Sequence, residues 1–136
     1  MASYWIRGDN IRKIVILDSS AILMFFEFSL AWEKELDRLL GAYSIVVPAA
    51  VLYELENLRE CKEGMQKQRV CAALKLIEKY EKIIVDTMAA DEAVLKIAQH
   101  TENSVVLTND TELRKRLTAC KIPVIFLRGR KKLAMT

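Results

Sequence analysis

The chain has 136 residues, enough for one compact domain, and it combines 52% hydrophobic with 29% charged residues and only four glycines and two prolines. This composition excludes a disordered, collagen-like or linker-dominated protein. The formal net charge of +3 is too small to demand or to exclude a nucleic-acid partner. A single histidine excludes a multi-histidine zinc site. The three cysteines form no CxxC pair, so we expect reduced, mostly buried thiols in a reducing compartment.

The longest apolar stretch, residues 14–32, has the length of a membrane span but contains Asp18 and Glu27. A carboxylate at the centre of a spanning helix costs about 2.5–3.5 kcal/mol, so a buried strand that leads into a core helix explains this stretch better. The first residues hold no apolar run typical of a signal peptide. We therefore expect a soluble, cytoplasmic protein with no membrane partner.

Short apolar runs alternate along the chain with segments of helical periodicity. The apolar runs predict five strands, at 13–17, 44–47, 83–85, 104–107 and 123–127. The segments between them predict helices at 21–40, 48–60, 68–82, from 91 onward, and at 111–119. Continuously apolar strands separated by helices are typical of a parallel sheet covered on both faces. We expect an α/β fold in which a five-stranded parallel sheet has helices on both faces.

No repeat or linker divides the chain, so we expect one domain over residues 1–136, with an N-terminal arm at 1–12 and a basic C-terminal tail at 128–136. Ligands of such sheets bind outside the carboxyl ends of the strands, near the point where the strand order reverses. Four acids fall at these ends. Asp18 and Asp110 follow the first and fourth strands, Glu54 lies in the helix after the second, and Asp91 begins the helix after the third.

Carboxylates that approach one edge of a sheet from separate segments are typical of a Mg²⁺ or Mn²⁺ site, because both ions prefer hard oxygen ligands. Each acid also has a structural explanation on its own. Asp18 and Asp110 are suited to capping the helices that follow them, and Asp91 to interacting with its helix dipole. Glu54 is explained equally well as a solvated helix residue. The convergence of all four favours the metal site.

Four motifs in this chain resemble those of the PIN-domain nucleases, in the family's order: LDSSAIL at 17–23, P-x-x-V-x-x-E-L at 48–55, D-x-x-V-L-x-x-A at 91–98 and V-L-T-N-D-x-E-L at 106–113. The closing KIPVIFLRGRKKL is similar to the last strand and basic tail of archaeal-type PIN proteins that resemble ribosomal-RNA-processing endonucleases. The resemblance covers almost the whole chain from Lys13.

The resemblance implies a metal-dependent endoribonuclease that hydrolyses RNA phosphodiesters with Mg²⁺ or Mn²⁺. It implies metal ligation by the four acids, with the neighbouring Glu92 as a further candidate. The implied catalytic set is Asp18, Glu54, Asp91 and Asp110, assisted by the hydroxyls of Ser19 and Thr108. Two roles remain open: a VapC-type toxin with an antitoxin partner, or an RNA-processing nuclease with a ribosome-assembly partner.

Basic side chains near the pocket are expected to hold RNA phosphates, a solvated helix face and a loose tail being the alternative explanation. They are Arg114, Lys115, Arg128, Arg130 and Lys131. PIN proteins are often homodimers, and one apolar group exceeds what a single helix face buries, so we expect it to contribute to a dimer interface. That group is Phe25, Phe26, Phe28, Leu30 and Trp32.

Two other classes of protein compete with a nuclease. One is a catalytically silent PIN fold that binds RNA or protein as a scaffold. The other is a phosphoacceptor receiver domain, which is also a five-stranded parallel fold and would use Asp86 and Thr108. The receiver interpretation is the weaker one, because no second acid precedes Asp18 and the PVIFLRG strand lacks the required lysine.

Overall fold

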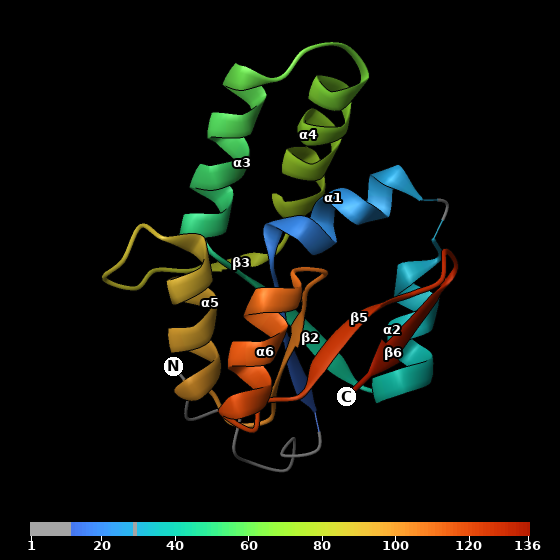
Figure 1. Ribbon diagram of the computed structural model, residues 1–136, viewed down its shortest axis with the longest axis vertical. Helices are drawn as coiled ribbons and strands as arrows, with labels where there is room; N and C mark the ends of the chain where they lie inside the picture. Colours follow the sequence, from blue (N-terminus) through green and yellow to red (C-terminus); the bar gives the residue numbers. More distant parts are fainter. Residues whose placement is uncertain (1–11, 29) are drawn as a thin grey trace.

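A computed structural model describes residues 12–28 and 30–136, in which a central sheet is flanked by helices (Figure 1). The strands are β1 (Lys13–Leu17), β2 (Tyr43–Pro48), β3 (Glu81–Ile83), β4 (Ser104–Leu107), β5 (Val124–Arg128) and β6 (Lys132–Met135). The helices are α1 (Ser19–Glu27), α2 (Trp32–Leu40), α3 (Ala49–Cys61), α4 (Gly64–Ile77), α5 (Ala90–Gln99) and α6 (Thr111–Ala119). Eleven residues of the expected N-terminal arm, 1–11, lie outside the described part of the chain.

The strands follow the order β3-β2-β1-β4-β5-β6 across the sheet. The first five strands are parallel, and β1 lies between β2 and β4. The chain therefore builds outward from β1 through β2 and β3, then returns to start the other half at β4. This reversal leaves the carboxyl ends of β1 and β4 side by side, since Leu17 pairs with Leu107 in the register. In a parallel sheet, that is the position where a ligand crevice forms.

Helices pack against the sheet, and two of them project beyond its carboxyl edge. On one face, α5 packs against β1, β2 and β4, and α6 lies beside it against β5. The helix α2 packs against β6 (Figure 1). The α3–α4 hairpin projects beyond the carboxyl edge of the sheet and contacts α1 (Figure 1). The central strands explain this arrangement, because all of β4 and nearly all of β1 are buried and need cover on both faces.

The expected α/β class is confirmed, but the sheet has a sixth strand that pairs antiparallel with β5. The segment expected as a basic tail supplies this strand. Gly129 adopts a positive φ of 72° at the turn, a conformation that glycine accepts without strain, and the chain then reverses. Leu133 is buried in the core while its two neighbours, Lys132 and Ala134, are exposed and half-buried, as expected where successive side chains point to opposite faces.

The expected single helix over residues 21–40 is wrong, because α1 ends at Glu27 and α2 begins at Trp32. The break lets the Phe25 and Trp32 rings stack with their centroids 4.2 Å apart and their planes within 5°. In a continuous helix, residues seven apart would be separated by roughly 10 Å along the axis, too far for this stack. Tertiary packing therefore outweighs local helical periodicity here.

The apolar group expected at a dimer interface is mostly buried within the domain. Phe25, Leu30 and Trp32 belong to the core, and Phe28 packs against it, which leaves Phe26 with 37% of its surface exposed. These residues therefore no longer support a dimer interface, and the homodimer stays a prediction.

The expectation of buried thiols is wrong. The three cysteines are free and exposed, because each occupies a solvent-facing or terminal helix position.

The third strand also lies two residues earlier than expected, at Glu81–Ile83. Within the described ranges, no helix has the length and apolar character needed to span a membrane.

Leu133 provides a test of β6 as part of the folded core. Leu133→Ala removes a side chain that is 1% exposed and should lower the free energy of unfolding by about 2–5 kcal/mol. The neighbouring exposed Lys132→Ala should change it by no more than about 0.5 kcal/mol. Urea unfolding of both variants measures the difference. Equal, small effects would mean that the segment behaves as a loose tail.

Candidate active site

Asp18 lies at the end of β1 and is only 3% exposed. It is the N-cap residue of α1, yet its side chain makes no capping hydrogen bond. Instead, Oδ2 accepts hydrogen bonds from the hydroxyls of Ser20 and Thr108, both at 2.7 Å. A buried carboxylate needs such partners because its desolvation is costly. The capping explanation for Asp18 is therefore wrong, and its carboxylate is held by two hydroxyl groups.

Thr108 follows β4 and connects the two central strands. Its side chain is fully buried and donates to Asp18, while its Oγ1 accepts from the backbone N–H of Asp110 at 3.0 Å. Asp110 is a true N-cap of α6: its Oδ1 accepts from the N–H groups of Glu112 and Leu113, at 2.9 and 3.1 Å. Capping of α6 thus uses Oδ1 of Asp110, whereas Oδ2 accepts no hydrogen bond from the described residues.

Glu54 lies on α3, the helix that follows β2, where its Oε1 accepts a hydrogen bond from Ser19 Oγ at 2.5 Å. Ser19 therefore orients Glu54, whereas the hydroxyl that supports Asp18 belongs to its neighbour Ser20. Ser20 also lies 3.2 Å from Thr108 Oγ1 and accepts from the backbone N–H of Asn109. Sequence reasoning missed Ser20. The available signal was its position two residues after Asp18, where a hydroxyl readily bonds back to the carboxylate.

Asp91 lies in the first turn of α5, and the charges of the other three acids influence its pKa. Burial raises its pKa above the ordinary 3.8, and the charges of Asp18, Asp110 and Glu54 raise it further. Arg116 acts in the opposite direction and lowers the pKa of Asp91. Asp91 therefore lies close enough to the other three acids, each from a separate segment, for their negative charges to disfavour its ionised form.

Glu92 is engaged elsewhere. Its Oε2 forms an ion pair with Arg116 Nη2 at 2.7 Å, which connects the start of α5 to α6. This pair directs Glu92 toward α6 and brings a guanidinium close to the acidic cluster formed by Asp18, Glu54, Asp91 and Asp110. Whether Glu92 contributes to the site instead of, or alongside, Asp91 stays a prediction.

The carboxylates of Asp18, Glu54 and Asp110 share one feature. Each uses a single oxygen to accept hydrogen bonds that fix its position, and its other oxygen accepts none from the described residues. Oriented acids with one free oxygen each have the donor chemistry that Mg²⁺ and Mn²⁺ prefer. Among residues 12–28 and 30–136, however, no group of three or more histidine, cysteine, aspartate or glutamate side chains is placed so that it could hold a metal ion.

The expected RNA-binding residues occupy two places. On α6, the Arg114 guanidinium lies 4.4 Å from the centroid of the Phe126 ring, and Lys115 pairs loosely with Glu112 at 3.5 Å. Arg128, at the end of β5, and Arg130 and Lys131, in the turn that follows, are exposed. Because β5 runs parallel to β4, this basic turn lies at the same edge of the sheet as Asp110.

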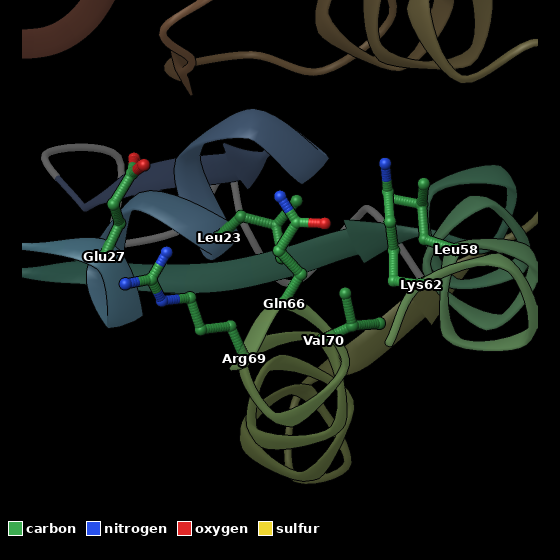
Figure 2. Close-up of a pocket in the computed structure, with 7 residues that line it drawn as sticks. All are labelled: Leu23, Glu27, Leu58, Lys62, Gln66, Arg69 and Val70. Atoms are coloured by element: carbon green, nitrogen blue, oxygen red, sulfur yellow. The ribbon is translucent and has the colours of Figure 1, made fainter. Parts of the chain in front are cut away.

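Two hollows flank α3. One, of about 420 Å³, includes the acid Glu54 and is lined by Ala50, Tyr53, Glu54, Asn57, Leu58, Cys61, Met88, Ala89 and Ala90. The other, of about 220 Å³, lies between α1, α3 and α4 (Figure 2). Its floor is apolar, Arg69 points to the side where Glu27 lies, and Lys62 lies on the opposite side (Figure 2). None of the four acids lines this second hollow.

Fold and site together define an α/β domain with a mostly parallel sheet and with acids close to the reversal of its strand order. Residues 15–130 match the family described as a PIN like domain, and the chain belongs to this family. The resemblance seen in the four sequence motifs is thereby confirmed. The receiver interpretation is excluded, and Asp86, which it would require, forms an ion pair with Lys96.

Two relatives cover nearly the whole chain. Ribonuclease VapC4 of Methanocaldococcus jannaschii is 32% identical over 120 residues, which are 86% of this chain and 92% of the relative. Ribonuclease VapC9 of Archaeoglobus fulgidus is 29% identical over 126 residues, which are 93% of this chain and 92% of the relative.

Solved structures share the fold. The PIN domain endonuclease Utp24 has a TM-score of 0.73 and 23% identity, with 90% of each chain covered. A domain of a functionally unknown protein from Methanocaldococcus jannaschii has a TM-score of 0.60 and 22% identity, with 86% of this chain and 92% of that chain covered.

The raised pKa of Asp91 predicts how stability varies with pH. The folded protein binds this proton more tightly than the unfolded chain, so ionisation of Asp91 lowers stability as pH rises from the ordinary 3.8 through the raised pKa. Asp91→Asn avoids this loss. Its stability relative to wild type should therefore increase from about pH 4 toward neutrality and then level off, by a modest amount because solvent screens the cluster.

Urea unfolding of metal-free protein across this pH range measures the difference. Asp37→Asn, which removes an exposed carboxylate on α2, is the control and should show no comparable trend. A relative stability of Asp91→Asn that stays flat or falls with rising pH would contradict the repulsion.

Proposed function

We propose that this protein is a metal-dependent endoribonuclease that hydrolyses RNA phosphodiester bonds at the acidic cluster. The observation that carries the proposal is the arrangement of Asp18, Glu54 and Asp110, each fixed through one carboxylate oxygen with the other left free. A purely structural protein gains nothing from gathering like charges at one edge, since their repulsion lowers stability. The cost is explained if a cation binds there.

The ligand candidates are Asp18, Glu54, Asp91 and Asp110, and their all-oxygen donor set fits Mg²⁺ or Mn²⁺. A divalent ion bound there supplies positive charge that stabilises the negative charge developing on the phosphate during hydrolysis. Ser20 and Thr108 hold the Asp18 carboxylate in place, and Ser19 holds Glu54. These hydroxyls act by positioning, since support of this kind fixes the direction of a ligand oxygen.

Cationic side chains at the same edge are proposed to contact the substrate backbone. Arg128, Arg130 and Lys131 are exposed there, and Arg114 and Lys115 lie on the helix that Asp110 caps. Phosphate contacts of this kind position a nucleic acid without reading its sequence. They explain how a protein with a net charge of only +3 attracts RNA to an acidic centre.

RNA is the proposed substrate because both near-full-length relatives are named ribonucleases. Their VapC names also support an antitoxin partner for this chain. The presence of a small antitoxin gene beside its own gene would separate this role from RNA processing.

Cleavage of labelled single-stranded and structured RNAs tests the activity directly. Wild type should cut in the presence of Mn²⁺ or Mg²⁺ and stop when EDTA is added. Asp18→Asn should lower the rate by about 10²-fold or more, because it weakens a ligand at the reacting centre. Ser20→Ala should lower it by about 10- to 100-fold, because the Asp18 carboxylate loses one of two supports.

The control variant is again Asp37→Asn, which should cleave as wild type does. Thermal unfolding must show that every variant is folded. The proposal is refuted if wild type cuts none of these RNAs with either ion while Asp18→Asn binds Mn²⁺ as tightly as wild type.

A further inference from the structure

The larger hollow beside α3 continues directly from the acidic cluster, because Glu54 belongs to both. Its remaining walls come from the exposed side of α3 and from the segment before α5, which contributes Met88 and Ala89. A volume of about 420 Å³ falls within the range usual for small-molecule sites, about 300–1,000 Å³. The hollow therefore has the size of a binding site and adjoins the proposed reaction centre.

Helical spacing explains why the hollow and Glu54 share one side of α3. Ala50, Glu54, Asn57 and Cys61 follow one another at intervals of four, three and four residues, which places them on one helix face. Tyr53 borders this face. The positions of Tyr53 and Asn57 relative to Glu54 are thus fixed by a single rigid helix.

The lining combines apolar surface with unused polar groups. Tyr53 is 42% exposed and Met88 is 73% exposed, so a flat aromatic ring and a polarisable thioether both face solvent. The side chains of Tyr53 and Asn57 form no hydrogen bond with any described residue. An asparagine amide offers both a donor and an acceptor to a ligand.

We propose that this hollow binds one unpaired nucleobase of the RNA, next to the bond that is cut at the acidic cluster. The base stacks on Tyr53, with Met88 on the apolar side, and Asn57 hydrogen-bonds its edge. Recognition of unpaired RNA bases by aromatic stacking and edge hydrogen bonds is general chemistry for this substrate. The inference rests on the proposed function and adds a determinant of sequence preference to it.

The charge of the lining favours a base over a phosphate. Glu54 is the one charged residue among the lining residues, and neither lysine nor arginine is present. An anionic group would be repelled there, whereas an uncharged, flat base with a polar edge matches the walls. The phosphates on either side of that base would remain outside, toward the basic turn and the metal ligands.

Cys61 provides a direct test because its exposed thiol lines the hollow, whereas the exposed thiol of Cys71 lines neither hollow. The rate of alkylation by N-ethylmaleimide would be followed at both thiols by mass spectrometry. The probe is a saturating RNA oligonucleotide in the presence of EDTA, which removes the divalent ion and so prevents cleavage during the experiment. Bound oligonucleotide should slow alkylation of Cys61 several-fold and leave Cys71 unchanged.

Variants then assign the protection to the stacked base. Tyr53→Ala should abolish the protection and weaken oligonucleotide binding by about 5- to 150-fold, the loss expected for one base–aromatic stack. Tyr53→Phe keeps the aromatic ring and should keep both the protection of Cys61 and the oligonucleotide affinity. Phe26→Ala removes another exposed aromatic ring, on α1 outside the hollow, and should behave as wild type. In cleavage assays, Asn57→Ala should redistribute the cut positions among bases with a larger effect on KM than on kcat.

The proposal is overturned if saturating oligonucleotide leaves Cys61 fully reactive, if no oligonucleotide binds, or if Tyr53→Ala retains the protection. It is also overturned if Cys61 becomes protected without RNA as protein concentration rises, because a second copy of the chain would then cover the hollow. Footprinting needs no cleavage, so protection in a protein that cuts no RNA would refute the nuclease and retain the base site.

Discussion

The hydrogen bond from Thr108 to Asp18 is the interaction on which the rest of this edge depends. It joins the carboxyl ends of β1 and β4, the two strands between which the strand order reverses. A carboxylate that is 3% exposed would be strongly unfavourable there without partners, and two hydroxyl donors offset that penalty. Because Thr108 also accepts from the N–H of Asp110, the same side chain fixes the start of α6 and the second acid.

This network explains how a domain of modest size holds like charges close together. Each oriented acid is tied down by neighbours that are themselves backbone groups or hydroxyls close to a strand or helix end. Arg116 adds a compensating positive charge, held in place through Glu92, and so reduces the repulsion that Asp91 experiences. Hydroxyl support and a nearby guanidinium together offset the cost of placing these carboxylates close to one another.

Local sequence patterns predicted the acids and the parallel strands because both are encoded locally. A buried parallel strand is a continuous apolar run, and the residue after it must lie at the carboxyl edge, so Asp18 and Asp110 follow from position alone. The choice between Ser19 and Ser20 does not follow in this way. It depends on the rotation of the first turn of α1 relative to β4 and α3, which only the assembled fold determines.

The other departures have the same origin. The break between α1 and α2 is invisible to periodicity, because Phe25 and Trp32 are seven residues apart and would share a face in one helix; their stacking across the break is a tertiary contact. The strand β6 was hidden because its one basic residue, Lys132, follows the basic turn at Arg130 and Lys131, although lysines are common on edge strands because they discourage pairing with other chains. In both cases, contacts distant in sequence decided between conformations that the local pattern left open.

The helix α3 carries residues of both the proposed reaction centre and the proposed base site. It begins immediately after β2, with Pro48 as its N-cap, and so its first two turns are anchored at the carboxyl edge of the sheet. Glu54, Tyr53 and Asn57 therefore move as one body, and any nucleotide held by the last two is presented to the acid at a fixed offset. Since a displacement of about 1 Å is enough to impair catalysis, placing both proposed sites on one helix is the physical basis on which the two proposals predict selective cleavage.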